Sequence, residues 1–393
     1  MGRRQVIKRL LSVCLLQVCF VFPAFAQTTA NEKIVFNWLG KLQFQTGKSA
    51  SNGAIRVHHT PAANSPNGTP FYQVSPYFGH LAALAVLETQ GSAGIPYAEN
   101  WIRWNLRHLS PASAKDGVPY EHFYRASGSD ETTCLDPANP KLCRYNDATD
   151  SAAALFLTVL YAFETSGGKQ EILLNPVNRK LIEAQGETIL KLQQPDGLVW
   201  AKANYPVEFL EDNCEVYGGL RSMALLEGRV YGDLKLSNWY QAAAERVRAG
   251  ILTTLYDPIN RRYRVSKQGD KLQDSDGKTW YPDLQAQFWV TLFRVEPADS
   301  PHRKERLKSL LEAWDREAKL ATPSLENAPQ HLHPEAEYAL ALLGEKTRAS
   351  AHLADTLRLK LPKTPADIGF DWQFTCADGG WTLLALKAIS GTR

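Results

Sequence analysis

The segment Thr149-Asp-Ser-Ala-Ala-Ala-Leu-Phe-Leu-Thr-Val-Leu-Tyr-Ala-Phe-Glu164 decides the fold of this chain. It opens with three polar residues and is then apolar nearly all round, which is typical of a helix buried on every side. Other apolar, helix-like runs also follow a short motif rich in acidic and aromatic residues, and a more charged run separates successive motifs. The six motifs are Pro76-Tyr-Phe-Gly-His80, Asn146-Asp-Ala-Thr-Asp-Ser151, Glu211-Asp-Asn-Cys-Glu-Val-Tyr217, Trp280-Tyr-Pro-Asp-Leu-Gln285, His331-Leu-His-Pro-Glu335 and Thr375-Cys-Ala-Asp-Gly-Gly-Trp381.

The hydrophobic pattern predicts helices that are alternately buried and amphipathic. This alternation fits two concentric rings, because inner helices touch neighbours on all sides while outer helices keep one wet face. A helical-repeat solenoid would have a fixed period, but the spacing between motifs falls from about 70 residues to about 45. We therefore predict an all-α toroid, an (α/α)6 ring of six helical hairpins with long loops and minor β-hairpins at its mouth. The twelve predicted helices are Asn31–Gln45, Tyr77–Glu88, Pro96–Leu109, Thr149–Glu164, Asn178–Gln193, Asn213–Glu227, Leu236–Leu255, Leu284–Val295, Arg303–Lys319, Ala336–Leu343, Thr347–Leu359 and Gly380–Ile389.

Three connections between these helices carry patterns of their own. The stretch from Ser110 to Asn146 is predicted to be a long loop. Asn52-Gly-Ala-Ile55 is predicted to be a small strand or a turn. Arg and Tyr alternate from Arg261 to Val265, which indicates one strand of a hairpin.

The first 26 residues have the pattern of a signal peptide. A basic start that ends at Arg9 precedes the mostly apolar stretch Leu10–Phe22, and Ala24-Phe-Ala26 is a small-x-small cleavage site. The apolar stretch is too short for a membrane-spanning helix. We therefore expect cleavage before Gln27 and a single (α/α)6-barrel catalytic domain over residues 27–393.

Four cysteines remain after this expected cleavage, and an even number in an exported chain suggests disulfides. Cys134 and Cys143 flank a turn-rich segment that a disulfide could pin as a loop. Cys214 and Cys376 would then pair by elimination and tie two distant motifs together. The alternative is that these cysteines are free, buried thiols.

Four stretches of the chain carry a resemblance to a known family. They are Asn52-Gly-Ala-Ile55, Pro76-Tyr-Phe-Gly-His-Leu-Ala-Ala-Leu84, Asp147-Ala-Thr-Asp-Ser-Ala-Ala-Ala-Leu-Phe156, and Asp196-Gly-Leu-Val-Trp-Ala-Lys202 with Phe209-Leu-Glu-Asp-Asn-Cys-Glu-Val-Tyr-Gly-Gly-Leu220. From Asn52 to its end, the chain resembles the six-hairpin glycosidase superfamily, and within it a bacterial group described as glycosidase-like. The resemblance implies an (α/α)6 barrel. Barrels of this type also host lyases and epimerases, so the fold alone does not decide the reaction.

Two acidic clusters lie where inner helices are predicted to start. Hydrolysis of a glycosidic bond commonly needs one carboxyl that donates a proton and another that activates water or attacks the sugar carbon. Asp212 and Glu215 are three residues apart and share a face once the helix has begun, and Asp150 heads the most apolar helix. We predict that Asp150 and Glu215 are the catalytic pair, with Asp212 as the substitute for either. The alternatives are helix capping for Asp150 and Asp212 and an ion pair with Arg221 for Glu215.

Aromatic and polar side chains in or beside the motifs are expected to bind the substrate. Sugar rings present C–H faces that stack on aromatic rings, and their hydroxyls need polar partners, although core packing is the alternative for each aromatic residue. Asp378 is instead predicted to be a turn or cap residue. The predicted substrate-binding residues are Tyr77, His80, Asp147, Trp200, Tyr205, Tyr217, Trp280, Asp283, Glu335, Trp372 and Trp381.

None of the usual metal-ligand spacings occurs in the sequence. His58 and His59 are adjacent, so in a strand they would point to opposite faces. His331 and His333 have a better spacing but no obvious third ligand. The chain also has no nucleophile elbow, phosphate loop or dinucleotide fingerprint. We therefore expect neither a metal ion nor a cofactor.

Together these patterns predict an exported glycoside hydrolase that acts on an oligo- or polysaccharide through two carboxyls. A polysaccharide lyase or sugar epimerase on the same barrel is one alternative, with Tyr217 or His80 as base and Arg56 as the neutralising group. A non-catalytic carbohydrate-binding protein is another. The net charge of +3 is spread evenly, which disfavours nucleic acid as a partner. We expect a monomer in the periplasm or the medium, with carbohydrate as its partner and no membrane contact after cleavage.

Overall fold

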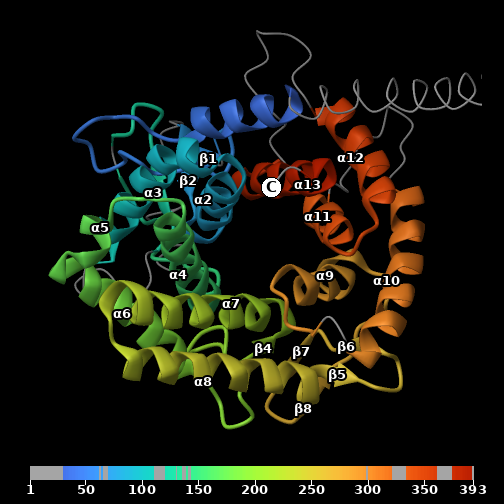
Figure 1. Ribbon diagram of the computed structural model, residues 1–393. Coiled ribbons are helices and arrows are strands. Elements are labelled where there is room, and N and C mark those ends of the chain that lie inside the picture. Colours follow the sequence, from blue (N-terminus) through green and yellow to red (C-terminus); the bar gives the residue numbers. More distant parts are fainter. Residues whose placement is uncertain are drawn as a thin grey trace, which may run out of the picture.

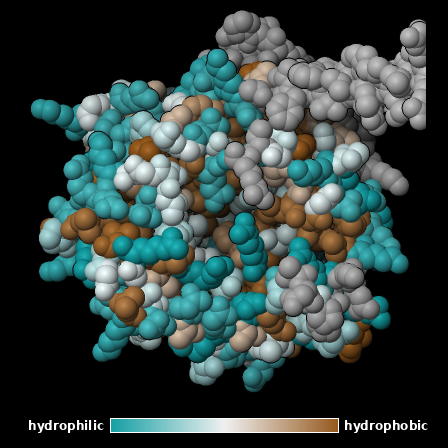
Figure 2. All heavy atoms as spheres, in the orientation of Figure 1, coloured by the Kyte–Doolittle hydropathy of each residue, from teal (hydrophilic) through white to brown (hydrophobic). Residues whose placement is uncertain are grey.

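The computed structural model describes residues 30–61, 63–64, 70–109, 120–129, 131–134, 139, 143–297, 300–320, 333–360 and 374–391. The expected signal segment and Trp372 lie outside these ranges. No helix in the described ranges is both long enough and apolar enough to cross a bilayer. One face of the molecule is mainly hydrophilic, with smaller apolar patches scattered over it (Figure 2).

Six helices form the inner ring predicted from the motifs. Each contacts the next along the chain, and the last packs against the first, which closes the ring (Figure 1). They are α2 (Pro76–Gln90), α4 (Thr149–Thr165), α7 (Leu210–Leu226), α9 (Gln285–Leu292), α11 (Pro334–Leu342) and α13 (Cys376–Ser390).

The more charged helices surround this ring (Figure 1). Those that follow α2, α4, α7 and α11 pack against them as the second members of helical hairpins. The toroid and all twelve predicted helices are confirmed. The outer helices are residues 30–42, α3 (Ile95–His108), α6 (Pro176–Leu192), α8 (Leu234–Gly250), α10 (Pro301–Leu320) and α12 (Lys346–Lys360).

Short helical segments lie next to these helices. The turn Ile251–Leu255 falls within the predicted helix Leu236–Leu255, whereas the others lie outside the predicted helices or overlap one at a single residue. One is the α-helix α5, and the others are a 3-10 turn and three π-helical turns. They are α5 (Gln170–Leu174), η1 (Gly91–Gly94), η3 (Glu227–Tyr231), η4 (Ile251–Leu255) and η5 (Trp280–Leu284).

The apolar sequence of α4 produces the tight packing of the inner ring. Twelve of its residues are buried, so it contacts protein on nearly every side. The neighbouring α7 approaches it at Gly219, where an added Cβ would lie 2.4 Å from the Cα of Ala154. Only glycine allows the two backbones to come this close.

Capping side chains define where several helices begin. Thr375 and Asp378 form a capping box at the start of α13, which confirms the predicted capping role of Asp378. Asn175 accepts hydrogen bonds from two backbone N–H groups at the start of α6, and Asp233 accepts one at the start of α8.

A buried ion pair links α10 to the segment after α9. Arg306 Nη2 lies 2.6 Å from Glu296 Oε2, and both side chains are almost completely buried. Arg306 also donates a hydrogen bond to the carbonyl oxygen of Gln287, and the Tyr263 hydroxyl donates one to Glu296. Every charge in this interior group therefore has a partner, as burial requires.

Small antiparallel sheets occupy the loops, as predicted. The hairpin strand expected over Arg261–Val265 is confirmed. It is β6 (Arg262–Tyr263), which pairs with β5 (Tyr256–Asp257). In the stretch Asn52–Ile55 the chain makes a turn, and Ile55 forms a single bridge to Gln43. The other strands are β1 (Ala63–Asn64), β2 (Pro70–Val74) and β3 (His122–Tyr124), joined in that order, and β4 (Glu208–Phe209), β7 (Ser266–Gln268) and β8 (Lys271–Gln273), joined in the order β4-β7-β8.

Only one of the two proposed disulfides is present among the described cysteines. Cys134 and Cys143 are bonded, as predicted. The pairing of Cys214 with Cys376 is wrong, because both are free and fully buried. Cys214 lies on α7 and Cys376 on α13, two helices on opposite sides of the inner ring. The alternative of free, buried thiols therefore holds for this pair.

Candidate functional site

A cleft of about 440 Å³ lies beside the start of α7. It is bounded by the loop before α4, the segment before β4, the first turn of α7 and the η5 turn before α9. Acidic side chains and tyrosines dominate its polar lining. These residues are Asp147, Glu211, Asp212, Tyr145, Tyr205 and Tyr281, with Lys202 adding a positive charge.

Glu215 lies on α7 about one turn after Asp212, and its side chain is fully buried. Its Oε1 accepts hydrogen bonds from the Tyr77 hydroxyl at 2.8 Å and from Trp289 Nε1 at 2.9 Å. Its Oε2 has no hydrogen bond of ordinary geometry. Arg221, the alternative partner, instead stacks over the ring of Tyr217. Glu215 is thus held at Oε1 by two neutral donors, and the Ser151 side chain is a further hydrogen-bonding neighbour of its carboxyl.

Burial raises the pKa of Glu215 to about 7. Hydrogen bonds from Ser151, Trp289 and Tyr77 oppose this shift, because they stabilise the ionised form. A carboxyl with a pKa near neutrality can exchange a proton during a reaction at neutral pH.

Asp212 lies in the first turn of α7, where the cleft begins, and is partly exposed. Burial raises its pKa well above the usual range, and the charges of Glu215 and Asp147 raise it further. Because α7 begins at Leu210, Asp212 and Glu215 are both helical and occupy one face, as predicted. Asp212 is therefore the predicted catalytic candidate that lines the cleft.

Asp150 is fully buried in the first turn of α4. Its Oδ1 accepts a hydrogen bond from the backbone N–H of Ser151, and its Oδ2 has no hydrogen bond of ordinary geometry. Burial raises its pKa well above the usual range, and the charge of Asp212 adds to the effect. Asp150 thus lies within electrostatic reach of the cleft carboxyls although it does not line the cleft.

Glu211 extends the same acidic group. Burial raises the pKa of Glu211 well above the usual range, and the charges of Glu215 and Asp212 raise it further. Carboxyls that crowd together cannot all ionise, so they share protons and titrate as a coupled group. The site therefore contains several carboxyls that can exchange protons beside an open cleft.

Three of the predicted substrate-binding residues belong to this site. Asp147 and Tyr205 line the cleft, and Tyr77 donates its hydrogen bond to Glu215. Tyr145, in the long loop, was not predicted; its hydroxyl donates a hydrogen bond to Asp147. The only sequence signal for Tyr145 is that it directly precedes an acidic motif.

Three other predicted residues lie in the core. His80 is buried against Trp101, whose Nε1 donates a hydrogen bond to His80 Nδ1, and burial lowers the pKa of His80 to about 3. Tyr217 and Trp381 are also buried, and Trp381 packs against the ring of Trp289. Core packing, the alternative for aromatic residues, describes these positions.

The candidates on the later motifs contact one another or the loops. Asp283 accepts a hydrogen bond from the backbone N–H of Asp276 and so holds the loop before η5. Trp280 stacks on the ring of His333, with centroids 3.5 Å apart. Glu335 is buried with Oε1 3.9 Å from His333 Nδ1, and its burial raises its pKa well above the usual range.

Trp200 lines a second groove of about 490 Å³ beside β4 and β7. Lys267 also lines this groove, and its Nζ donates hydrogen bonds to Asp196 at 2.6 Å and to Glu208 at 2.7 Å. The remaining candidate, Trp372, falls outside the described residues.

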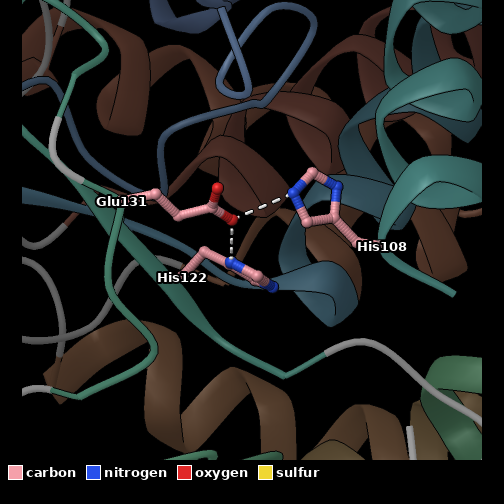
Figure 3. A group of neighbouring side chains, drawn as sticks. All are labelled: His108, His122 and Glu131. Atoms are coloured by element: carbon pink, nitrogen blue, oxygen red, sulfur yellow. Dashed lines mark hydrogen bonds and ion pairs between the residues drawn. The ribbon is translucent and has the colours of Figure 1, made fainter. Parts of the chain in front are cut away.

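Within the described ranges, one group of side chains has the arrangement of metal ligands: His108, His122 and Glu131 (Figure 3). Their ligand atoms all lie within 4.8 Å of one another. The sequence did not indicate this group, because the three residues come from the end of α3, from β3 and from the loop after it, at spacings that match no motif.

No protein-family model and no curated protein matches the chain. Solved structures do share its architecture. One is described as a novel alpha-amylase from Clostridium perfringens, with 14% identity, a TM-score of 0.57, and coverage of 91% of this chain and 97% of that one. A glycosidase in complex with glucose has 13% identity, a TM-score of 0.56, and coverage of 93% and 98%. A cold-adapted family 8 xylanase has 11% identity, a TM-score of 0.55, and coverage of 93% of each chain. The chain therefore has the (α/α)6 fold of these glycosidases.

Proposed function

We propose that this protein is an exported glycoside hydrolase that cleaves an oligo- or polysaccharide with two carboxyls. One observation carries the proposal: Asp212 and Glu215 lie one turn apart on α7, where a tyrosine-lined cleft meets a group of coupled carboxyls. The solved structures that share the fold and are named glycosidases support the same class of reaction.

The hydrogen bonds around the pair favour one distribution of a shared proton. Glu215 Oε1 receives two donors, from Tyr77 and Trp289, and these stabilise its carboxylate form. Asp212 lines the cleft, and burial together with the charges of Glu215 and Asp147 raises its pKa well above the usual range. We assign the proton of the singly protonated pair to Asp212, and the negative charge to Glu215.

In this assignment Asp212 donates its proton to the glycosidic oxygen as the bond to the sugar carbon breaks. Glu215 then takes a proton from the water that attacks this carbon, or attacks the carbon directly. Its Oε2, which accepts from neither Tyr77 nor Trp289, supplies the acceptor in either case. Asp150, the other catalytic candidate from the sequence, is buried beside the pair in the first turn of α4, and the charge of Asp212 helps to raise its pKa.

The tyrosines of the cleft give the substrate a place to bind. Tyr145, Tyr205 and Tyr281 are 46%, 47% and 67% exposed, so their rings are open to a ligand. Lys202 lies over the ring of Tyr145 and donates a hydrogen bond to the carbonyl oxygen of Asn146, which orders this wall of the cleft. Aromatic faces beside acidic oxygens suit the C–H faces and hydroxyls of a sugar chain.

The test is to incubate the purified protein with α- and β-glucans, mannans, uronate polymers and bacterial exopolysaccharides, and to measure reducing ends and ultraviolet absorbance. We expect reducing ends without absorbance on one class of substrate. Asp212→Asn and Glu215→Gln should each abolish turnover, while Glu245→Gln, on the outer helix α8, should not change it.

Other outcomes would replace the proposal. Absorbance that rises together with reducing ends would identify a lyase. Binding to one polysaccharide with no product, unaffected by Asp212→Asn and Glu215→Gln, would identify a binding protein. Full turnover in Glu215→Gln would remove that residue from the mechanism.

Export is a separate part of the proposal, and it rests on the signal-like pattern of residues 1–26. The Cys134–Cys143 disulfide supports it, because such bonds persist in oxidising compartments. Mass spectrometry of the protein from fractionated cells should find a chain that begins at Gln27, in the periplasm or in the medium. A chain that keeps residues 1–26 in the cytoplasm would contradict export.

A further inference from the structure

Two imidazole rings from separate segments converge on a single carboxylate oxygen, which belongs to a third segment. His108 Nε2 lies 3.0 Å and His122 Nδ1 lies 2.7 Å from Oε1 of Glu131, and Figure 3 shows both rings directed at this carboxylate. Two imidazole nitrogens and one carboxylate are a common ligand set for first-row divalent cations.

We propose that His108, His122 and Glu131 bind a divalent transition-metal ion such as Zn²⁺. The hydrogen bonds of His108 carry the argument. Its Nδ1 lies 2.7 Å from the carbonyl oxygen of Trp104, which can only accept, so Nδ1 bears the proton of the neutral ring. The lone pair of Nε2 then faces an oxygen of Glu131 that is also an acceptor. A cation between the two atoms turns this repulsion into attraction.

His122 presents a second nitrogen that fits the same ion. The side chain is buried, and Nδ1 has no hydrogen bond of ordinary geometry despite its short distance to Glu131. A ligand that accepts its lone pair would satisfy this atom. The two histidines and the carboxylate leave a further position open, and the Glu131 side chain is 30% exposed on that loop.

The surroundings resemble the second layer of a metal site. A metal-binding histidine usually donates its other N–H to a carbonyl or carboxylate, as His108 does to Trp104. The Tyr124 hydroxyl donates to Glu131 Oε1 at 3.0 Å and accepts from Trp104 Nε1 at 3.1 Å. The rings of His108 and Trp104 stack with centroids 4.3 Å apart, so the ligands are held in a rigid aromatic setting.

The two nitrogen–oxygen distances require only a small expansion. Bonds of about 2.0–2.1 Å in tetrahedral geometry place donor atoms about 3.3 Å apart. The two nitrogens would therefore move from Glu131 by a few tenths of an ångström. His108 ends a helix and Glu131 lies in a loop, so both can shift by this amount without breaking the core.

The ion would fix one wall of the cleft. His122 belongs to β3, which pairs with β2, and the next residue toward the N-terminus, Glu121, donates its backbone N–H to the carbonyl oxygen of Tyr145. Tyr145 lines the cleft and contacts Asp147. The ion and the Cys134–Cys143 disulfide would thus hold the same long loop at two points, so we assign the ion a structural role.

The experiment uses the full chain without an affinity tag, stripped with a chelator and dialysed. Zn²⁺ is titrated in competition with a chromophoric chelator, and Co²⁺ is added to a second sample to record its visible absorption. We expect one ion per chain and a rise in the melting temperature with metal. His108→Gln and Glu131→Gln should weaken binding by more than about 100-fold, and Tyr124→Phe by about 10-fold.

His352→Gln is the matched control, because His352 contacts a single carboxylate, Glu337, outside the group. It should bind Zn²⁺ as the wild type does. If His108→Gln fails to fold, Glu131→Gln still tests the site, because Glu131 is on the surface. Stoichiometric binding that survives both ligand substitutions, or no binding by the wild type, would overturn the proposal and leave only a protonated histidine–carboxylate pair.

Discussion

Replacing Glu215 by glutamine should make the protein's stability less dependent on pH. Burial raises the pKa of Glu215 from the usual 4.5 to about 7, so the folded state binds this proton more tightly than the unfolded chain does. The contribution to the free energy of unfolding is therefore fully present below pH 4.5 and is lost as the pH rises through 7. From these two pKa values the loss between pH 5 and pH 8 is about 2–3 kcal/mol.

Glutamine cannot ionise, but it keeps an oxygen that can accept from Tyr77 and Trp289. The variant should therefore fold and lose only the pH-dependent cost of a buried negative charge. Urea unfolding at pH 5 and pH 8 should give a smaller decrease in the free energy of unfolding for Glu215→Gln than for the wild type, by about 2–3 kcal/mol. Turnover should be abolished in the same variant.

Glu245→Gln provides the control, since Glu245 lies on α8 with its side chain 46% exposed. Its pH dependence should match that of the wild type. Equal decreases for the wild type and Glu215→Gln would refute the reasoning, because they would mean that Glu215 has the same pKa in the folded and unfolded chain.

Three further changes test the packing. Replacing Cys134 and Cys143 together by alanine should lower the free energy of unfolding by about 2.5 kcal/mol, the loop-closure value for a separation of 9 residues, as measured by urea unfolding. Gly219→Ala should cost about 1–3 kcal/mol, because the added Cβ meets the backbone of α4, whereas Gly40→Ala, with open space around its Cβ, should be neutral or stabilising; thermal melts of both variants compare them. Arg306→Met should cost about 3–5 kcal/mol, since it leaves a buried glutamate without its charged partner, and a decrease within 0.5 kcal/mol would contradict that account.

The helices could be predicted because their hydrophobic pattern is local. The apolar sequence of α4 requires the inner ring, where protein surrounds the helix. The polar face of α6 requires the outer ring, where one side meets water. The start of α7 was placed three residues late, at Asn213, because the acidic Glu211 and Asp212 look like a loop. In the folded chain they belong to its first turn, where negative charge is favourable.

Contacts between distant segments were harder to predict. Elimination pairs Cys214 with Cys376, but closure of the ring places α7 and α13 on opposite sides. The partnership of His108 with His122 depends on a loop whose path no local pattern describes. In both cases the deciding information is the three-dimensional order of the elements.

Tyr77 shows how a local helix pattern and a contact between distant segments combine in the site. It lies on α2, and Glu215 lies on α7, with α4 between them in the ring. Two side chains on non-adjacent helices of a closed ring can meet only if both project toward the axis, and the 2.8 Å hydrogen bond requires this. The third partner, Trp289, comes from α9, on the other side of α7. The sequence places the carboxyl of Glu215 near the start of an apolar helix, but the two neutral donors that stabilise its ionised form follow only from ring closure.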